Sequence, residues 1–149
     1  KIPEEVIKKI LEAGRYTPSA RNWQAWHFIA ITNREVLEKI GSLSATGRFI
    51  AQAPLAVAVV TNPSTPFSET DGARAIQNMT LAAWEEGIGS CWVSQIEREK
   101  VKEMLSIPKE LHLLTVLPFG YPLEEKVTRK KDRKPFEEVT FREKFGVKF

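Results

Sequence analysis

Apolar residues recur along the chain with two periods, one typical of helices and one typical of buried strands. Helical spacing predicts four helices, over residues 3–15, 33–40, 71–86 and 97–105. Asn33 and Asp71 are the expected N-caps of the second and third. Runs rich in β-branched and aromatic residues predict four strands, over residues 26–32, 55–61, 90–94 and 113–119. Because helices alternate with strands, we expect an α+β or α/β fold with a largely covered sheet.

The helix predicted over residues 71–86 carries the most informative pattern. No charged residue lies between Ala75 and Trp84, and the large apolar residues point all round the axis: Ile76, Met79, Leu81 and Trp84. A helix that is apolar on most sides must be enclosed on most sides. We therefore expect this helix both to fill the core and to pack against a second subunit.

The composition is that of one globular domain. The chain has 149 residues, of which 42% are apolar, so residues 1–149 are expected to form a single domain with one core. The longest apolar run, residues 54–60, is too short to cross a bilayer, and no membrane association is expected. A lone cysteine excludes an intramolecular disulfide framework and is typical of a reducing compartment, so we expect a cytoplasmic protein.

The net charge of +3 is concentrated near the C-terminal end. Residues 1–123 contain 13 basic and 13 acidic side chains, whereas residues 124–149 contain nine and six. The basic run at residues 126–134 could be a solvated arm, an anion site for a phosphate-bearing ligand or a nucleic-acid patch. Nucleic acid is the least favoured partner, because the rest of the chain is neutral. The same tail carries several apolar residues that need a docking surface, which a partner subunit would supply: Phe136, Val139, Phe141, Phe145, Val147 and Phe149.

Most standard catalytic constellations are absent from the sequence. His27 and His112 have no carboxylate at ligand spacing, so they do not predict a metal site. Cys91 has no basic neighbour in sequence and is expected to be a buried core thiol. An enzyme with so few acid–base candidates can still work if a cofactor carries the chemistry.

Three segments favour a cofactor site over purely structural roles. Residues 18–26 (PSARNWQAW) combine a hydroxyl, two amides and two indoles, and could line an aromatic ligand. Residues 87–94 (GIGSCWVS) follow the apolar helix and could present backbone groups to a ligand. Residues 131–135 (KDRKP) could hold a phosphate by charge and bidentate geometry. The structural alternatives are a capping loop for residues 18–26, a core strand for residues 87–94 and a solvated arm for residues 131–135.

Together these segments resemble the FMN-dependent nitroreductase family. Residues 18–26 are similar to its flavin loop, usually P-S-x-x-N-x-Q-P-W, with Ala25 in place of the last proline. Residues 71–84 resemble its central dimer helix, and residues 87–94 match its G-[IL]-G-[ST]-C-W-[IV]-[GS] segment. Residues 117–122 (LPFGYP) and 133–136 (RKPF) resemble two further family motifs, and all five occur in the family's order.

The resemblance implies an α+β (α/β sandwich) fold with a mixed central sheet, flanking helices and a C-terminal arm that reaches the partner subunit. It implies a homodimer with FMN at the subunit interface and NADH or NADPH as reductant. Hydride would pass through flavin N5 to a nitroaromatic, a quinone or a similar small acceptor in ping-pong fashion, without a catalytic side chain. The implied flavin contacts come from one subunit's loop, from the other's strand segment and from the basic run: Pro18, Ser19, Ala20 and Asn22; Trp92, Val93 and Ser94; Lys131 and Arg133.

The sequence departs from the family pattern in two places. The basic R-R-S-x-R segment that begins family members would lie before Lys1. Either residues upstream of Lys1 carry it, or the flavin phosphate depends on Lys130, Lys131 and Arg133 alone. The long lid that many members insert before the central helix is replaced by residues 62–70, which predicts an open flavin face and broad acceptor selection.

Two other functions remain open on the sequence. One is a flavin-binding or structural homodimer of the same fold without turnover, and the other is a basic-tail nucleic-acid binder. Neither the physiological acceptor nor the choice between NADH and NADPH can be derived from these residues.

Overall fold

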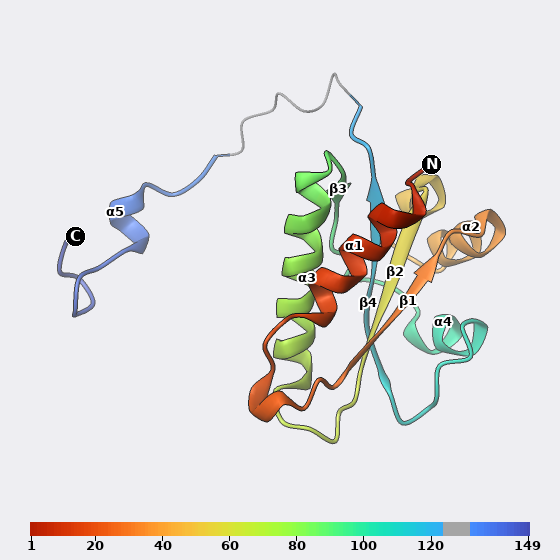
Figure 1. Ribbon diagram of the computed structural model, residues 1–149, viewed down its shortest axis with the longest axis horizontal. Coiled ribbons are helices and arrows are strands. Elements are labelled where there is room, and N and C mark those ends of the chain that lie inside the picture. Colours follow the sequence, from red (N-terminus) through yellow and green to blue (C-terminus); the bar gives the residue numbers. More distant parts are fainter. Residues whose placement is uncertain (124–131) are drawn as a thin grey trace.

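Four antiparallel strands form one sheet in the order β1-β2-β4-β3 in the computed structural model, which describes residues 1–123 and 132–149 (Figure 1). The strands are β1 (Trp26–Ile31), β2 (Leu55–Thr61), β3 (Gly89–Ser90) and β4 (His112–Gly120). The α+β class is confirmed, but the expected mixed sheet is not: every strand pair among the described residues is antiparallel. A mixed sheet needs a parallel strand, and the described part of this chain supplies none.

The central strand β2 is buried on both faces, as its continuous apolar run predicts. Alternate side chains of β2 enter two separate cores. Leu55, Val57 and Val59 join the core beneath α1 (Glu4–Arg15) and α3 (Ser68–Glu85). The intervening residues join the core beneath three short helices: α2 (Arg34–Ser42), the 3-10 helix η2 (Arg48–Gln52) and α4 (Arg98–Met104). Helices therefore cover both faces of the sheet (Figure 1).

The helix α3 begins three residues earlier than predicted. It starts at Ser68 after Phe67, which has a left-handed backbone with φ of 68°. The prediction that Asp71 is the N-cap is wrong, because Asp71 lies inside the first turn. Its carboxylate instead accepts a hydrogen bond from the backbone of Ala20, 51 residues away.

The strand predicted over residues 90–94 is much shorter than expected. Only Gly89 and Ser90 pair with β4, and the chain then leaves the sheet edge. The backbone carbonyl of Val93 is held by the Thr115 hydroxyl at 2.8 Å rather than by a ladder partner. The prediction of a buried Cys91 is consequently wrong, since this thiol is exposed.

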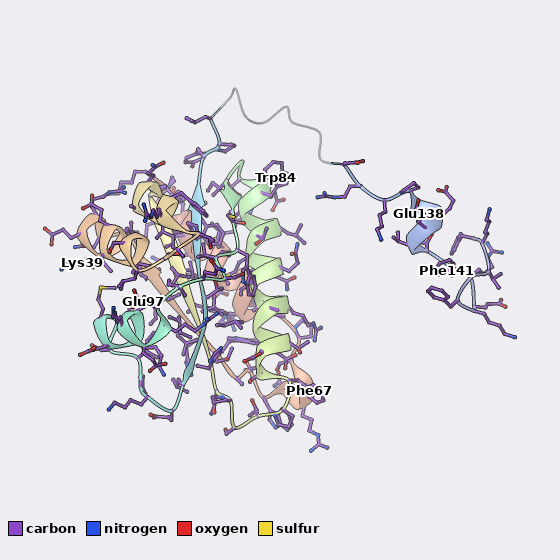
Figure 2. The ribbon with its side chains drawn as sticks, turned by 180° about the vertical axis from the view of Figure 1, so that it is seen from behind. Lys39, Phe67, Trp84, Glu97, Glu138 and Phe141 are labelled. Carbon is purple, nitrogen blue, oxygen red and sulfur yellow. The ribbon has the colours of Figure 1, made fainter. Side chains whose placement is uncertain are left out.

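Enclosure of α3 on most sides is also not found in the single chain. Ile76 and Met79 are buried, but Leu81 and Trp84 are 59% and 62% exposed. Figure 2 shows Trp84 at the upper end of α3. Packing of that side against a second subunit remains a prediction.

The described C-terminal residues 132–149 contain one short helix, α5 (Phe136–Val139). Phe136 and Phe149 meet edge to face with ring centroids 6.0 Å apart, yet both remain exposed. Most large apolar residues of the tail are thus exposed within the described chain: Phe136, Val139, Phe145, Val147 and Phe149. No helix in residues 1–123 or 132–149 combines the length and the apolar character needed to span a membrane.

Candidate functional site

The loop at residues 17–24 has an unusual backbone that its own residues hold together. It contains the 3-10 turn η1 (Ala20–Asn22), and Arg21, Asn22 and Gln24 have φ of 48°, 57° and 49°. Such left-handed conformations are unfavourable for residues other than glycine, least so for asparagine. The hydroxyl of Ser19 accepts the backbone N–H of Gln24 at 2.9 Å and closes the loop. Its tip, residues 21–24, is exposed.

Two hydrogen bonds attach this loop to one side of α3. The Ala20 N–H donates to Oδ2 of Asp71 at 2.9 Å, and Nδ2 of Asn78 donates to Oγ1 of Thr17 at 2.8 Å. Asp71 and Thr17 are buried, with 4% and 5% of their surface exposed. The two anchors bracket Pro18 and Ser19, which the sequence predicts as flavin contacts.

The second segment, residues 89–95, presents backbone donors. Carbonyl oxygens of Val93 and Ser94 are already engaged, by the Thr115 hydroxyl at 2.8 Å and by Nη2 of Arg98 at 3.3 Å. No hydrogen bond among the described residues uses the backbone N–H of Trp92, Val93 or Ser94. Trp92 is 43% exposed and Val93 is buried. The segment therefore offers N–H groups and an aromatic face, which are suitable partners for a polar heteroaromatic ring.

The helix α3 stands between the two segments. The loop contacts α3 at Asp71, whereas the hydroxyl of Ser90 donates to that of Thr80 at 3.3 Å. Nine residues separate these contacts, which corresponds to about 14 Å along the axis and about 180° around it. Within one chain, the loop and Ser90, two residues before the 92–94 contacts, thus meet opposite sides of the helix, and Val93 lies in the core on the other face of the sheet from α3.

An exposed stripe of α3 runs between these two sides. Its residues recur at helical spacing and are all exposed: Thr70, Arg74, Gln77, Leu81 and Trp84. The stripe becomes more apolar toward the C-terminal end of the helix, where Leu81 and Trp84 lie. Large apolar side chains grouped on a surface are typical of a protein–protein contact.

Of the two predicted phosphate ligands, the structure describes Arg133, and no described hydrogen bond joins Arg133 to either segment. Lys131 lies outside the described residues. Arg133 is exposed, and its described hydrogen bond is a local one to the carbonyl of Asp132 at 3.2 Å. No hydrogen bond or ion pair among the described residues joins 132–149 to 1–123.

A groove lies elsewhere on the described part of the chain. It has a volume of about 980 Å³ and runs between the start of α1, the edge of β1 and the start of α2. Ile7, Leu11, Ala30 and Arg34 line it, and neither flavin segment does. The candidate site is therefore defined by the chemistry of the two segments and not by this groove. In the described part of the chain, no group of three His, Cys, Asp or Glu side chains could hold a metal ion.

Sequence reasoning missed the residues that support both segments. Asp71 and Asn78 were placed on the helix but not against the loop. Gly47 was not singled out, yet a Cβ there would lie 2.5 Å from Cγ1 of Val93. The sequence offers one relevant signal, which is Asp71 at the start of an apolar helix. An aspartate in that position is ordinarily interpreted as an N-cap.

Comparisons with known proteins identify the family of the chain. The family model described as the nitroreductase family matches residues 1–62 and 43–121. A Methanothermobacter thermautotrophicus protein, provisionally named NADH dehydrogenase/NAD(P)H nitroreductase, is 38% identical over 136 residues, which are 86% of this chain and 71% of that protein.

Solved structures share the fold over nearly the whole chain. A Bacteroides thetaiotaomicron protein with the same provisional name superposes with a TM-score of 0.86 and 25% identity, covering 97% of this chain and 88% of that one. An FMN-dependent nitroreductase from Clostridium difficile R20291 gives a TM-score of 0.87 at 23% identity, covering 97% and 90%. The second likeness shows the fold alone.

Proposed function

Because the chain belongs to the nitroreductase family, we propose that it is an FMN-dependent oxidoreductase. In this proposal residues 1–149 form one domain. It takes hydride from NADH or NADPH and reduces nitroaromatics, quinones or similar electron-poor acceptors. Bound FMN would supply the hydride-transfer chemistry through N5, with the reductant and the acceptor reacting in ping-pong order. The residues of the chain itself bind, orient and shield the flavin.

Backbone donors of residues 92–94 fit this role. The carbonyls of Val93 and Ser94 are occupied, so their N–H groups are what this segment can offer to a ring nitrogen or oxygen. A buried N–H without a partner is rare in folded proteins, and the one of Val93 is best satisfied by a ligand or an ordered water. The indole of Trp92 adds an apolar wall.

The loop residues fit the other half of the site. Pro18, Ser19, Ala20 and Asn22 form a preset turn whose exposed tip can contact the edge of a ring. Preorganised contacts of this kind cost little conformational entropy on binding.

The observation that carries the proposal is the position of α3 between the two halves. Since the loop and Ser90 meet opposite sides of α3 and Val93 lies on the other face of the sheet, the proposed complete site combines the loop of one copy with the 92–94 segment of another. The exposed stripe with Leu81 and Trp84 is the surface available for that contact. We therefore propose a homodimer with a two-fold axis, in which one self-complementary patch serves both copies.

The C-terminal arm completes the proposed assembly. Its exposed phenylalanines would pack on the partner subunit, and Lys131 and Arg133 would bind the flavin phosphate. Nucleic acid is not a partner in this proposal, because the basic run binds the single phosphate of the flavin.

Broad acceptor selection is part of the proposal. Only residues 62–67 separate β2 from α3, and Pro66 and Phe67 are exposed. So short a connection cannot form a lid over a flavin. A steady-state assay showing one acceptor preferred by several orders of magnitude would contradict this part. We place the enzyme in the cytoplasm, because a single exposed thiol suits a reducing compartment.

A visible absorption spectrum tests the cofactor and the reaction together. The protein is incubated with excess FMN, desalted and titrated with NADH or NADPH without oxygen. Flavin bands that are retained and then bleach are the expected result. Retained bands that neither reductant bleaches would favour a flavin-binding dimer without turnover, and no retained flavin would overturn the proposal.

Mixing two inactive variants tests the division of the site between subunits. Ser19→Trp blocks the loop and Ser94→Trp blocks the second segment, so neither homodimer should retain flavin. In a mixed dimer one of the two sites combines an unaltered loop with an unaltered segment. Random mixing should therefore restore about a quarter of the wild-type flavin content. Ser42→Trp, on the exposed surface of α2, controls for the added bulk. No recovery on mixing would place both halves in one chain.

A further inference from the structure

The loop at residues 17–24 has an unfavourable backbone conformation and is anchored to the rest of the molecule by contacts outside it. Arg21, Asn22 and Gln24 are left-handed, and none is glycine. Strained backbone of this kind persists only when surrounding contacts over-determine it, and it is concentrated at functional sites. The Ser19–Gln24 hydrogen bond closes the loop but does not orient it relative to the rest of the molecule.

The orientation comes from α3. Its two loop contacts, at Asp71 and Asn78, are seven residues apart and so lie on the same face of the helix. The helix itself is firmly seated, because Met79 is buried and a Cβ on Gly14 of α1 would lie 3.0 Å from its Cγ. A loop atom that is hydrogen-bonded to this face of α3 is therefore fixed relative to the core.

Asp71 is the more informative of the two anchors. A carboxylate with 4% of its surface exposed is costly to bury without strong partners. Its one short bond among the described residues is to the Ala20 N–H at 2.9 Å, since the ion pair with Arg74 is long, at 3.5 Å. The charge of Asp71 is thus aimed at the backbone of the loop.

We propose that Asp71 is a positioning residue for the flavin, which acts by fixing the Ala20 N–H and with it the left-handed turn that contacts the ring. The inference rests on the proposed function for its ligand, while the loop geometry can be tested without any flavin. Asp71 itself does not touch the ring in this assignment.

A competing explanation is that Asp71 merely stabilises the start of α3. An acidic side chain in the first turn interacts favourably with the positive end of a helix. Asp71→Asn and Asp71→Ala separate the two explanations. The asparagine removes the charge but keeps an oxygen that can accept the Ala20 N–H, whereas the alanine removes both. Glu69→Gln, an exposed carboxylate in the same turn, is the matched control for charge loss.

The experiment measures two quantities for each variant: the hydrogen-exchange rate of the Ala20 amide in flavin-free protein, and the dissociation constant of FMN. In Asp71→Ala, we expect Ala20 exchange to accelerate by about tenfold or more and FMN binding to weaken by about 10- to 100-fold. Asp71→Asn should stay within about threefold of wild type in both, even if its thermal stability falls.

Several outcomes would overturn the inference. One is an Asp71→Ala protein that matches Glu69→Gln in both measurements, and another is Asp71→Asn behaving like Asp71→Ala. If Asp71→Ala does not fold, Ala20→Pro removes the donor instead, next to a Ser19 backbone that is already extended. It should weaken FMN binding as much as Asp71→Ala would, and unchanged affinity would refute the inference. If wild-type protein binds no FMN, the proposed function fails, while Ala20 exchange still decides whether Asp71 holds the loop.

Discussion

Gly47 approaches Val93 more closely than any larger residue could, which makes Gly47→Ala a direct test of how the 92–94 segment is supported. A Cβ at position 47 would lie 2.5 Å from Cγ1 of Val93 and 2.5 Å from Oγ of Ser44. Carbon atoms in contact are normally about 3.5–4.0 Å apart. The backbone at Gly47 has φ of −115°, which alanine adopts freely, so the cost of the substitution is steric.

Neither neighbour of Gly47 can move without loss. Val93 is 1% exposed within the core beneath α2 and α4. The hydroxyl of Ser44 accepts the Gly47 N–H at 2.9 Å and donates to the Gln95 carbonyl at 2.8 Å. Overpacking of this kind costs about 1–3 kcal/mol, and a disturbed hydrogen bond adds about 1 kcal/mol. We therefore expect Gly47→Ala to destabilise the protein by about 2–4 kcal/mol.

Urea unfolding at one fixed protein concentration measures this loss. Gly89→Ala is the control, because the nearest atom to a Cβ there is the Gly120 carbonyl oxygen at an ordinary 3.6 Å. It should change stability by no more than about 0.5 kcal/mol. Adding Val93→Ala to Gly47→Ala relieves the clash, so the double variant should be about 1–2 kcal/mol more stable than the sum of the single losses. Strict additivity, or a Gly47→Ala protein as stable as the control, would refute the reasoning.

Three further substitutions test separate parts of the molecule. Trp84→Asp should yield a monomer in sedimentation velocity with little change in the folding of each chain, because Trp84 is 62% exposed in the single chain; a dimer that survives would remove this side of α3 from the interface. Met79→Ala should cost about 2–5 kcal/mol in urea unfolding, because Met79 is fully buried, and an effect below that range would mean that the core repacks. Arg133→Ala should weaken FMN binding by about 1–3 kcal/mol in a fluorescence titration. Arg142→Ala, an exposed arginine of the same tail, should leave the affinity unchanged, and equal effects of both would exclude a specific phosphate contact.

The sequence predicted the strands and helices best where burial is decided locally. The continuous apolar run of β2 requires cover on both faces, and the structure gives it two cores. The start of α3 was misplaced, because an aspartate before an apolar run usually caps its own helix. Here the partner of Asp71 is Ala20, and no local pattern carries information about a contact across 51 residues.

The candidate site was predicted as a set of segments but not as an arrangement. Residues 18–22 and 92–94 stand out by composition and by family resemblance, whereas their support by Asn78 and Gly47 depends on distances that spacing along the chain does not encode. Cys91 illustrates the same limit. Its apolar neighbours suggested a buried strand, but β3 ends at Ser90, so the thiol is exposed.

The difference between the predicted enclosure of α3 and its observed exposure has another physical origin. The apolar pattern of a helix marks every side that is to be buried, whether the same chain or another chain covers that side. The single chain covers only the side that carries Ile76 and Met79, and leaves Leu81 and Trp84 in solvent. Two large exposed apolar side chains on one stripe are typical of a protein–protein contact. The side that the chain leaves open is also the side that separates the two halves of the proposed flavin site. A second copy placed there would bury the stripe and complete the site in one step, so assembly and flavin binding should stabilise each other.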